Sequence, residues 1–163
     1  MDDRSTEILE LLASNCRLTA DQIAGMLDMD AEEVRRTIAA LEAKKIILGY
    51  RAMVNWERAG KERVLAFIEI KVQPQRDVGF QAVAERIYRY PEVKTLYLMS
   101  GAFDLAALVE GRTMQDVANF VATKLAPIEG VMSTTTHFVM QTYKEEGVVL
   151  DEYQKDRRLV VSP

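Results

Sequence analysis

The sequence predicts an α+β protein built from an N-terminal winged helix-turn-helix, residues 1–54, and a C-terminal ferredoxin-like βαββαβ domain, residues 64–144. Three observations predict this fold class. Three short segments with helical spacing of apolar residues stand at the front of the chain. A short apolar run broken by Gly49 follows them. Further along, apolar extended runs and helical patterns alternate in the order strand, helix, strand, strand, helix, strand.

The three N-terminal helices are predicted from their periodicity and from their start signals. The first, over residues 5–13, follows two aspartates whose negative charge favours a helix start. In the second, Thr19 is the expected cap and Gln22 completes a capping box. In the third, Asp30 is the expected cap, with Glu33 as its partner. Short helices joined by tight turns are typical of a helix-turn-helix, although a small bundle that merely packs shows the same pattern.

Residues 46–54 form an apolar segment that predicts a two-stranded wing. Three helices followed by a wing favour DNA binding over a purely structural role. The net charge of −4 and the pI of about 5.2 argue against indiscriminate nucleic-acid binding, which needs a positive field. They leave room for a small DNA-binding face. Residues 55–63 are polar, contain Gly60 and are predicted to be a linker.

The C-terminal domain is predicted around a hairpin, whose two apolar strands flank Ser100-Gly-Ala-Phe-Asp104. Gly101 supplies backbone freedom for the turn, and Asp104 can accept bonds from nearby backbone N–H groups. The remaining elements are predicted at residues 64–72 (a strand ended by Pro74), 80–88 (a helix), 114–125 (a helix) and 131–144 (a strand).

Both C-terminal helices are expected on one face of an antiparallel sheet, which leaves the other face open. A homodimer is an ordinary way to cover such a face. Residues 145–163 are predicted to be a tail, in which residues 158–161 can add an edge strand. No apolar run approaches the ~20 residues that span a bilayer, and the start of the chain lacks a signal-peptide layout. No membrane contact and a cytoplasmic location are therefore expected, and the single Cys16 fits a reducing compartment.

The combination resembles the Lrp/AsnC (feast/famine) family of transcription regulators over about residues 6–144. The resemblance implies that the C-terminal part is a RAM domain that senses an amino acid. It also implies homodimers formed through that domain, which assemble further into tetramers or octamers. The residues that carry the resemblance are Asn15 and Arg17, Arg36, Leu41-Glu42, Ile47-x-Gly49-Tyr50, Gly101-x-Phe103-Asp104, and Gly130-Val131 followed by Thr134 and Thr136.

The resemblance implies a site for double-stranded DNA. The third helix, residues 30–44, would lie in the major groove. Arginines there can contact phosphate or guanine, and Glu32 can accept from a cytosine amino group or serve only the helix start. The candidate DNA-binding residues are Arg17, Glu32, Arg35, Arg36, Ala39, Lys44 and Arg51.

The resemblance also implies a small-molecule effector, usually an amino acid, bound between dimers. Asp104 can face its ammonium group, and backbone N–H groups near Gly101 its carboxylate. Thr134 and Thr136 stand two apart, so both hydroxyls fall on one strand face. The alternative is a turn aspartate with ordinary strand threonines. The candidate effector-binding residues are Ser100, Gly101, Phe103, Asp104, Thr134 and Thr136.

The third helix departs from the family pattern. Asp30 stands where Ser or Thr is usual, Thr37, Ala39 and Ala40 where Arg or Lys is frequent, and Lys45 where Gly is usual. Each missing basic residue removes a possible phosphate contact. The first 55 residues also carry more acidic than basic side chains. We therefore expect one dimer to bind DNA weakly and several dimers on one DNA to compensate through effective concentration.

Two alternatives to an effector-responsive DNA-binding regulator stay open. The first is an effector-sensing or co-assembly protein with weak or lost DNA binding. The second is an enzyme, because siroheme decarboxylases look similar to this family and use histidines near the porphyrin. This chain has one histidine, His137, which is predicted to alternate away from Thr134 and Thr136. It has no P-loop, nucleophile elbow or zinc-protease motif. We therefore expect no enzyme, no catalytic residue, no cofactor and no metal site.

Overall fold

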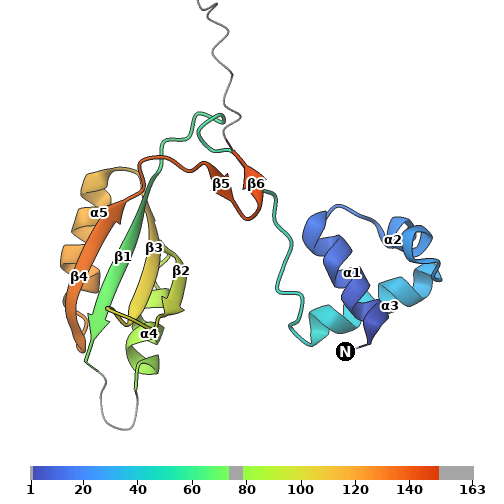
Figure 1. Ribbon diagram of the computed structural model, residues 1–163, viewed down its shortest axis with the longest axis horizontal. Helices are drawn as coiled ribbons and strands as arrows, with labels where there is room; N and C mark the ends of the chain where they lie inside the picture. Colours follow the sequence, from blue (N-terminus) through green and yellow to red (C-terminus); the bar gives the residue numbers. More distant parts are fainter. Residues whose placement is uncertain (1, 74–78, 151–163) are drawn as a thin grey trace, which may run out of the picture. The chain divides into compact units, whose positions relative to one another are not determined.

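The computed structural model describes residues 2–73 and 79–150, and the chain divides into two compact units, Met1–Val54 and Asn55–Pro163 (Figure 1). Each unit has its own hydrophobic core. Within the described residues, no helix is long and apolar enough to cross a bilayer.

The N-terminal unit contains the three predicted helices, α1 (Asp3–Ser14), α2 (Ala20–Leu27) and α3 (Ala31–Ala43). The caps follow the sequence signals. Thr19 and Gln22 form the predicted capping box, and the Asp30 carboxylate accepts from the N–H groups of Glu32 and Glu33, although Glu33 returns no side-chain bond. One buried stripe from each helix forms the core, namely Ile8, Leu12, Ile23, Ala24 and Val34.

The predicted hairpin of the wing is wrong for this structure, because residues 46–54 contain no strand. Ile47 packs against the helical core, and the Tyr50 hydroxyl donates a hydrogen bond to Glu42 on α3 at 3.0 Å. Leu48 remains 87% exposed. An isolated two-stranded hairpin is marginally stable in water, and this segment is instead held by side-chain contacts to α3.

Helix α3 ends at a residue with left-handed backbone geometry. Lys45 has φ 58°, and its N–H donates to the carbonyl of Glu42, while the N–H of Ile46 donates to the carbonyl of Leu41. These bonds satisfy carbonyls at the end of the helix in the way that usually selects glycine at this position. A side chain in this region costs roughly 1–2 kcal/mol. The lysine that departs from the family pattern therefore carries backbone strain.

Replacing Lys45 with glycine is expected to stabilise the N-terminal unit by roughly 0.5–1 kcal/mol, because the relieved strain exceeds the added entropy of the unfolded chain. Lys44 is the matched control, since its φ of −79° suits any residue. Lys44→Gly should destabilise the unit by a similar amount. Urea unfolding followed by the amide exchange of α3 measures both variants. Equal losses in the two would contradict the strain at Lys45.

The C-terminal unit is a four-stranded antiparallel sheet with the order β2-β3-β1-β4. The strands are β1 (Val64–Val72), β2 (Val93–Leu98), β3 (Leu105–Gly111) and β4 (Val131–Phe138), and the helices are α4 (Gln81–Tyr88) and α5 (Met114–Phe120). The predicted ferredoxin-like order is confirmed. The predicted strand end at Pro74 and the edge strand at residues 158–161 lie outside the described residues.

The last strand was predicted to continue to residue 144, and this is wrong. It ends at Phe138, and the chain then forms a separate hairpin of β5 (Lys144–Glu145) and β6 (Val148–Val149). Glu146 and Gly147 have φ values of 45° and 87° at its turn. Two successive positive φ angles suit a tight two-residue hairpin turn, so the chain reverses here.

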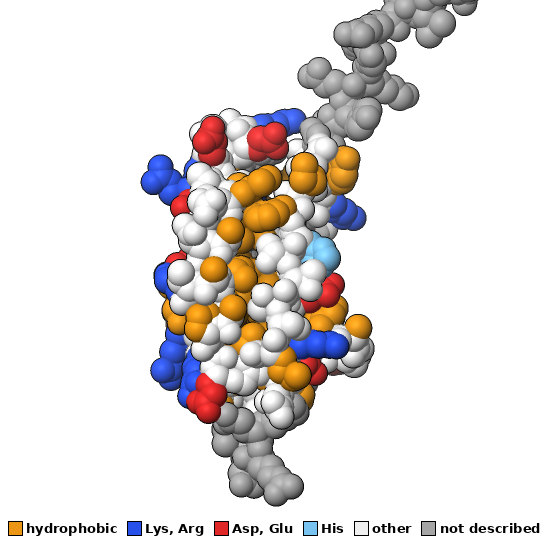
Figure 2. Space-filling model, turned by 90° about the vertical axis from the view of Figure 1, so that its left-hand side faces the viewer, with side chains coloured by type: hydrophobic (Ala, Val, Ile, Leu, Met, Phe, Trp, Pro, Cys, Tyr) orange, Lys and Arg blue, Asp and Glu red, His pale blue; other side chains and the backbone are white. Residues whose placement is uncertain are grey.

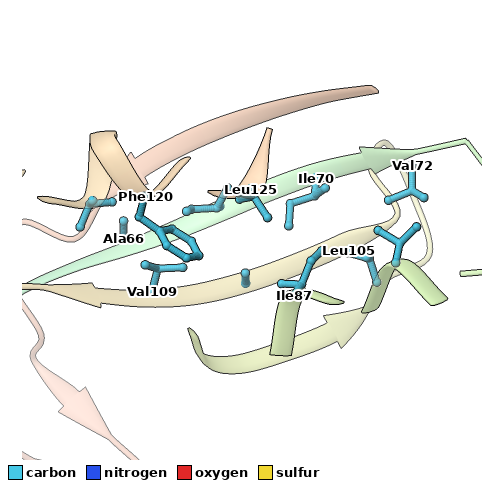
Figure 3. Packing of buried hydrophobic residues seen from close by; sticks show 12 residues of the cluster. Ala66, Ile70, Val72, Ile87, Leu105, Val109, Phe120 and Leu125 are labelled. Carbon is cyan, nitrogen blue, oxygen red and sulfur yellow. The ribbon is translucent and has the colours of Figure 1, made fainter. Parts of the chain in front are cut away.

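Both helices cover one face of the sheet, and the core lies between them and the strands (Figure 3). Alternate residues of β1 and β3 point into it, and Ile87 of α4 and Phe120 of α5 meet them. The other sheet face carries the intervening residues, among them Phe67 and Glu69 of β1. No element of the described chain lies over most of this open face (Figure 1).

Helix α5 continues into one π-helical turn, Val121–Leu125. The N–H of Ala126 donates to the carbonyl of Val121 at 2.8 Å, which closes the wide turn. Leu125 is fully buried, while Lys124 pairs with Glu92 and lies over the ring of Tyr90. The hydrogen bond from Lys124 holds the pKa of Glu92 below its ordinary value, although burial opposes this. The wide turn thus serves the core and a surface ion pair together.

Candidate DNA-binding and effector sites

The exposed face of α3 carries arginines that are paired with acidic side chains. Arg35 lies 3.3 Å from Asp21 on α2 and 3.4 Å from Glu32, and Arg36 lies 3.8 Å from Glu32. The opposite face of the helix is buried through Val34 and Leu41. The helix therefore presents charged side chains to solvent, but its positive charge is locally balanced.

All seven candidate DNA-binding residues are exposed, but only three of them are in contact with one another, as Arg35, Glu32 and Arg36 are. Arg17 precedes α2, Lys44 caps the end of α3, and Arg51 lies in the segment after it. Sequence reasoning missed Asp21. Its one available signal was a position in the first turn of α2, which equally suits a helix start.

Tyr50 fastens the segment after α3 to the helix. Burial and the hydrogen bond to Glu42 raise the pKa of its hydroxyl above the ordinary value. The Cys16 thiol lies 3.6 Å from the carbonyl of Arg51 and holds the same segment from the other side of the turn before α2. The segment is therefore fixed at two points.

The turn between β2 and β3 is built around Asp104. Its Oδ2 accepts from the N–H of Val72 at 2.8 Å, and its own N–H donates to the carbonyl of Ile70 at 3.0 Å. The register of β1 with β4 shifts between Lys71 and Val72, so the regular ladder does not serve this N–H. At least one carboxylate oxygen of Asp104 thus braces the backbone.

Ser100 and Gly101 lie at the exposed tip of this turn. The φ of Gly101 is 135°, which disfavours any side chain, and a Cβ there would meet no neighbour within 4 Å. Phe103 packs edge-on against Phe67 of the open face, with ring centroids 6.3 Å apart. The tip is open to a ligand or to another chain.

The two threonines lie on the helix side of β4. Thr134 is opposite Ile70 and Thr136 is opposite Ile68, and both isoleucines belong to the core beneath the helices. Leu105, which follows the turn, is also opposite Ile70 but on the other side of β1. Two strand spacings, about 10 Å, therefore separate Thr134 from the turn.

A single chain consequently does not gather the six effector candidates into one pocket. A cavity of about 660 Å³ lies elsewhere in the unit, lined mainly by residues 55–63 and 139–142, and includes none of them. Figure 2 shows a band of hydrophobic side chains along the side of the unit where β4 and α5 lie. A second protein surface can cover such a band.

His137 lies on the open face, as predicted from its alternation with the threonines. Its Nε2 is 3.2 Å from Glu69 Oε1, and its ring lies 6.3 Å from that of Phe67. No group of three potential metal-ligating side chains occurs within residues 2–73 and 79–150. The histidine has a partner within its own sheet.

A helix-turn-helix joined to a separate antiparallel sheet domain defines a class of DNA-binding transcription regulators with a ligand-binding module. The family models agree. A winged helix-turn-helix DNA-binding model matches residues 1–47, and the Lrp/AsnC ligand binding domain matches residues 65–149. The chain belongs to the Lrp/AsnC family of transcription regulators.

Its relatives share this architecture over nearly their whole length. The HTH-type transcriptional regulator YugG of Bacillus subtilis is 46% identical over 100% of this chain and 99% of its own. Two solved structures share the fold. The leucine response regulatory protein of Mycobacterium tuberculosis has a TM-score of 0.76 at 20% identity, covering 93% and 100% of the two chains. A Neisseria meningitidis regulator in complex with L-Met has a TM-score of 0.72 at 23% identity, covering 89% and 93%.

Proposed function

We propose that this chain is a sequence-specific DNA-binding regulator that responds to a small effector, an amino acid, and that works as an assembly of dimers. Its two units divide the labour, with double-stranded DNA read by the N-terminal unit and the effector bound by the C-terminal unit. The observation that carries the proposal is the pairing of an exposed charged helix in one unit with an open sheet face and an open glycine turn in the other.

Reading by α3 is supported by its position and its side chains. It is the third helix of the unit, its apolar stripe is buried, and Arg35 and Arg36 stand on its exposed side. Arginine can bind guanine with two hydrogen bonds or contact phosphate. The candidate contacts of this helix are therefore one base-reading and one backbone-positioning arginine.

An effector site shared between chains is supported by the geometry of the C-terminal unit. The glycine turn and Thr134 flank β1 from opposite sides, so a second copy is needed to complete a pocket around either. An amino acid suits the turn because backbone N–H groups near Gly101 can meet a carboxylate. The Neisseria regulator of the same fold was solved with L-Met.

The proposal is tested with the full-length protein on genomic DNA and with calorimetric titration of each standard amino acid. We expect saturable binding of at least one amino acid, and discrete protected DNA fragments whose protection changes when that amino acid is present. Gly101→Arg should remove the response. If no amino acid binds and Gly101→Arg leaves assembly and protection unchanged, the effector half is wrong.

A second candidate is a co-assembly protein with weak or lost DNA binding. The ion pairs that occupy Arg35 and Arg36 favour it, because a paired arginine attracts phosphate less. The same experiment separates the two functions. A regulator yields discrete protected fragments, whereas a co-assembly protein binds the amino acid and protects no DNA.

A further inference from the structure

We propose that Asp21 sets the sequence specificity of this protein by holding Arg35 and suppressing attraction to DNA of arbitrary sequence. This inference rests on the proposed function, since it concerns DNA bound by α3. Asp21 is a positioning residue, because it acts through Arg35 rather than by touching DNA itself.

The geometry places Asp21 against the whole end of the Arg35 side chain. Its Oδ1 lies 3.3 Å from Nη1 and 3.4 Å from Nη2 of Arg35. The third guanidinium nitrogen, Nε, lies 3.4 Å from Glu32 on the same helix as Arg35. One acidic residue from α2 and one from α3 therefore grip all three nitrogens and orient the guanidinium between the two helices.

The local charge is balanced by this arrangement. Asp21 and Glu32 contribute two negative charges, and Arg35 and Arg36 contribute two positive ones. Non-specific affinity for DNA depends on how many phosphates the protein neutralises. A cluster without net charge thus adds little to binding at an arbitrary sequence.

The pairs are weak enough to be exchanged at the right sequence. The Asp21 side chain is 73% exposed and that of Arg35 is 48% exposed, so water screens the attraction between them. A guanine edge offers Arg35 two directed hydrogen bonds in place of the carboxylate. Asp21 therefore penalises plain phosphate attraction more than base reading, which raises the ratio of specific to non-specific affinity.

Asp21 also lies in the first turn of α2, where a negative charge stabilises a helix. That role changes the stability of the unit and does not depend on Arg35. The two roles are separated by measuring DNA binding in a cycle with an Arg35 variant.

The test uses Asp21→Asn, which removes the charge and keeps a similar shape. The probes are a short duplex of random sequence and a genomic fragment that the wild-type protein protects most strongly. We expect Asp21→Asn to bind the random duplex about three- to tenfold more tightly, with a steeper salt dependence and a smaller gain on the protected fragment. Asp21→Glu should restore wild-type behaviour.

Glu10→Gln is the matched control, because Glu10 is an exposed acidic residue of α1 and its loss changes the net charge equally. The effect of Asp21→Asn should also vanish in an Arg35→Gln background. A gain no larger than that of Glu10→Gln, or one that persists without Arg35, would overturn the role of Asp21. Wild-type protein that favours no genomic fragment refutes the proposed function instead, and the random duplex still decides whether Asp21 restrains Arg35.

Discussion

Replacing Asp104 with alanine is expected to destabilise the C-terminal unit by about 2 kcal/mol, because it strands a buried N–H group. The N–H of Val72 donates to Asp104 Oδ2 at 2.8 Å, and Val72 is only 3% exposed. The shift in register at Lys71 and Val72 leaves this donor without a ladder partner. Urea unfolding monitored on the sheet measures the loss.

Asp104→Asn separates the structural role from the effector role. Its amide oxygen can still accept from Val72, so the free energy of unfolding should fall by less than about 1 kcal/mol. The negative charge that faces an effector ammonium is gone, and the affinity for the amino acid should fall by about tenfold or more. A variant that loses stability like Asp104→Ala, or one that keeps full effector affinity, would show that only the brace matters.

The second large effect is expected on assembly, from a change of Tyr97 on the open sheet face to aspartate. Tyr97 is opposite Ala106, outside the core, and is 59% exposed on β2. If the open face is the dimer interface, a charge there should weaken dimerisation by about 30-fold or more. DNA affinity should fall with it, because linked reading heads bind through effective concentration.

Tyr88→Asp is the matched control for this experiment. Tyr88 is 52% exposed on α4, in the helical layer that covers the opposite face of the sheet. Sedimentation velocity and fluorescence anisotropy with DNA measure the two variants side by side. Equal weakening by both, or an obligate dimer that binds DNA as tightly as the native assembly, would argue against the link between the open face, assembly and affinity.

Local signals in the sequence predicted most of the elements. Periodicity located the helices and strands, and the capping box at Thr19 and Gln22 appears as expected. The two failures follow from pairing. Residues 46–54 have strand-like composition but side-chain contacts to α3, and the last strand stops at Phe138 because the chain turns back at Glu146 and Gly147.

The candidate sites were less predictable because they depend on which strands and helices become neighbours. The alternation of Thr134 and Thr136 was legible, but their position on the helix side of the sheet follows from their register with β1. The pairing of Arg35 with Asp21 joins residues 14 positions apart on two helices. Neither the register nor this contact has a local signal.

The π-helical turn at Val121–Leu125 has a consequence for how this chain tolerates changes of length. A wide turn holds one residue more than the α-helical pitch requires. Deleting a single residue there would restore regular pitch and rotate everything beyond it by about 100°. Leu125, now fully buried, would swing away from the interior. The spacing of this short stretch is therefore under tighter constraint than its side chains, and drift in this part of the gene should favour substitution over loss.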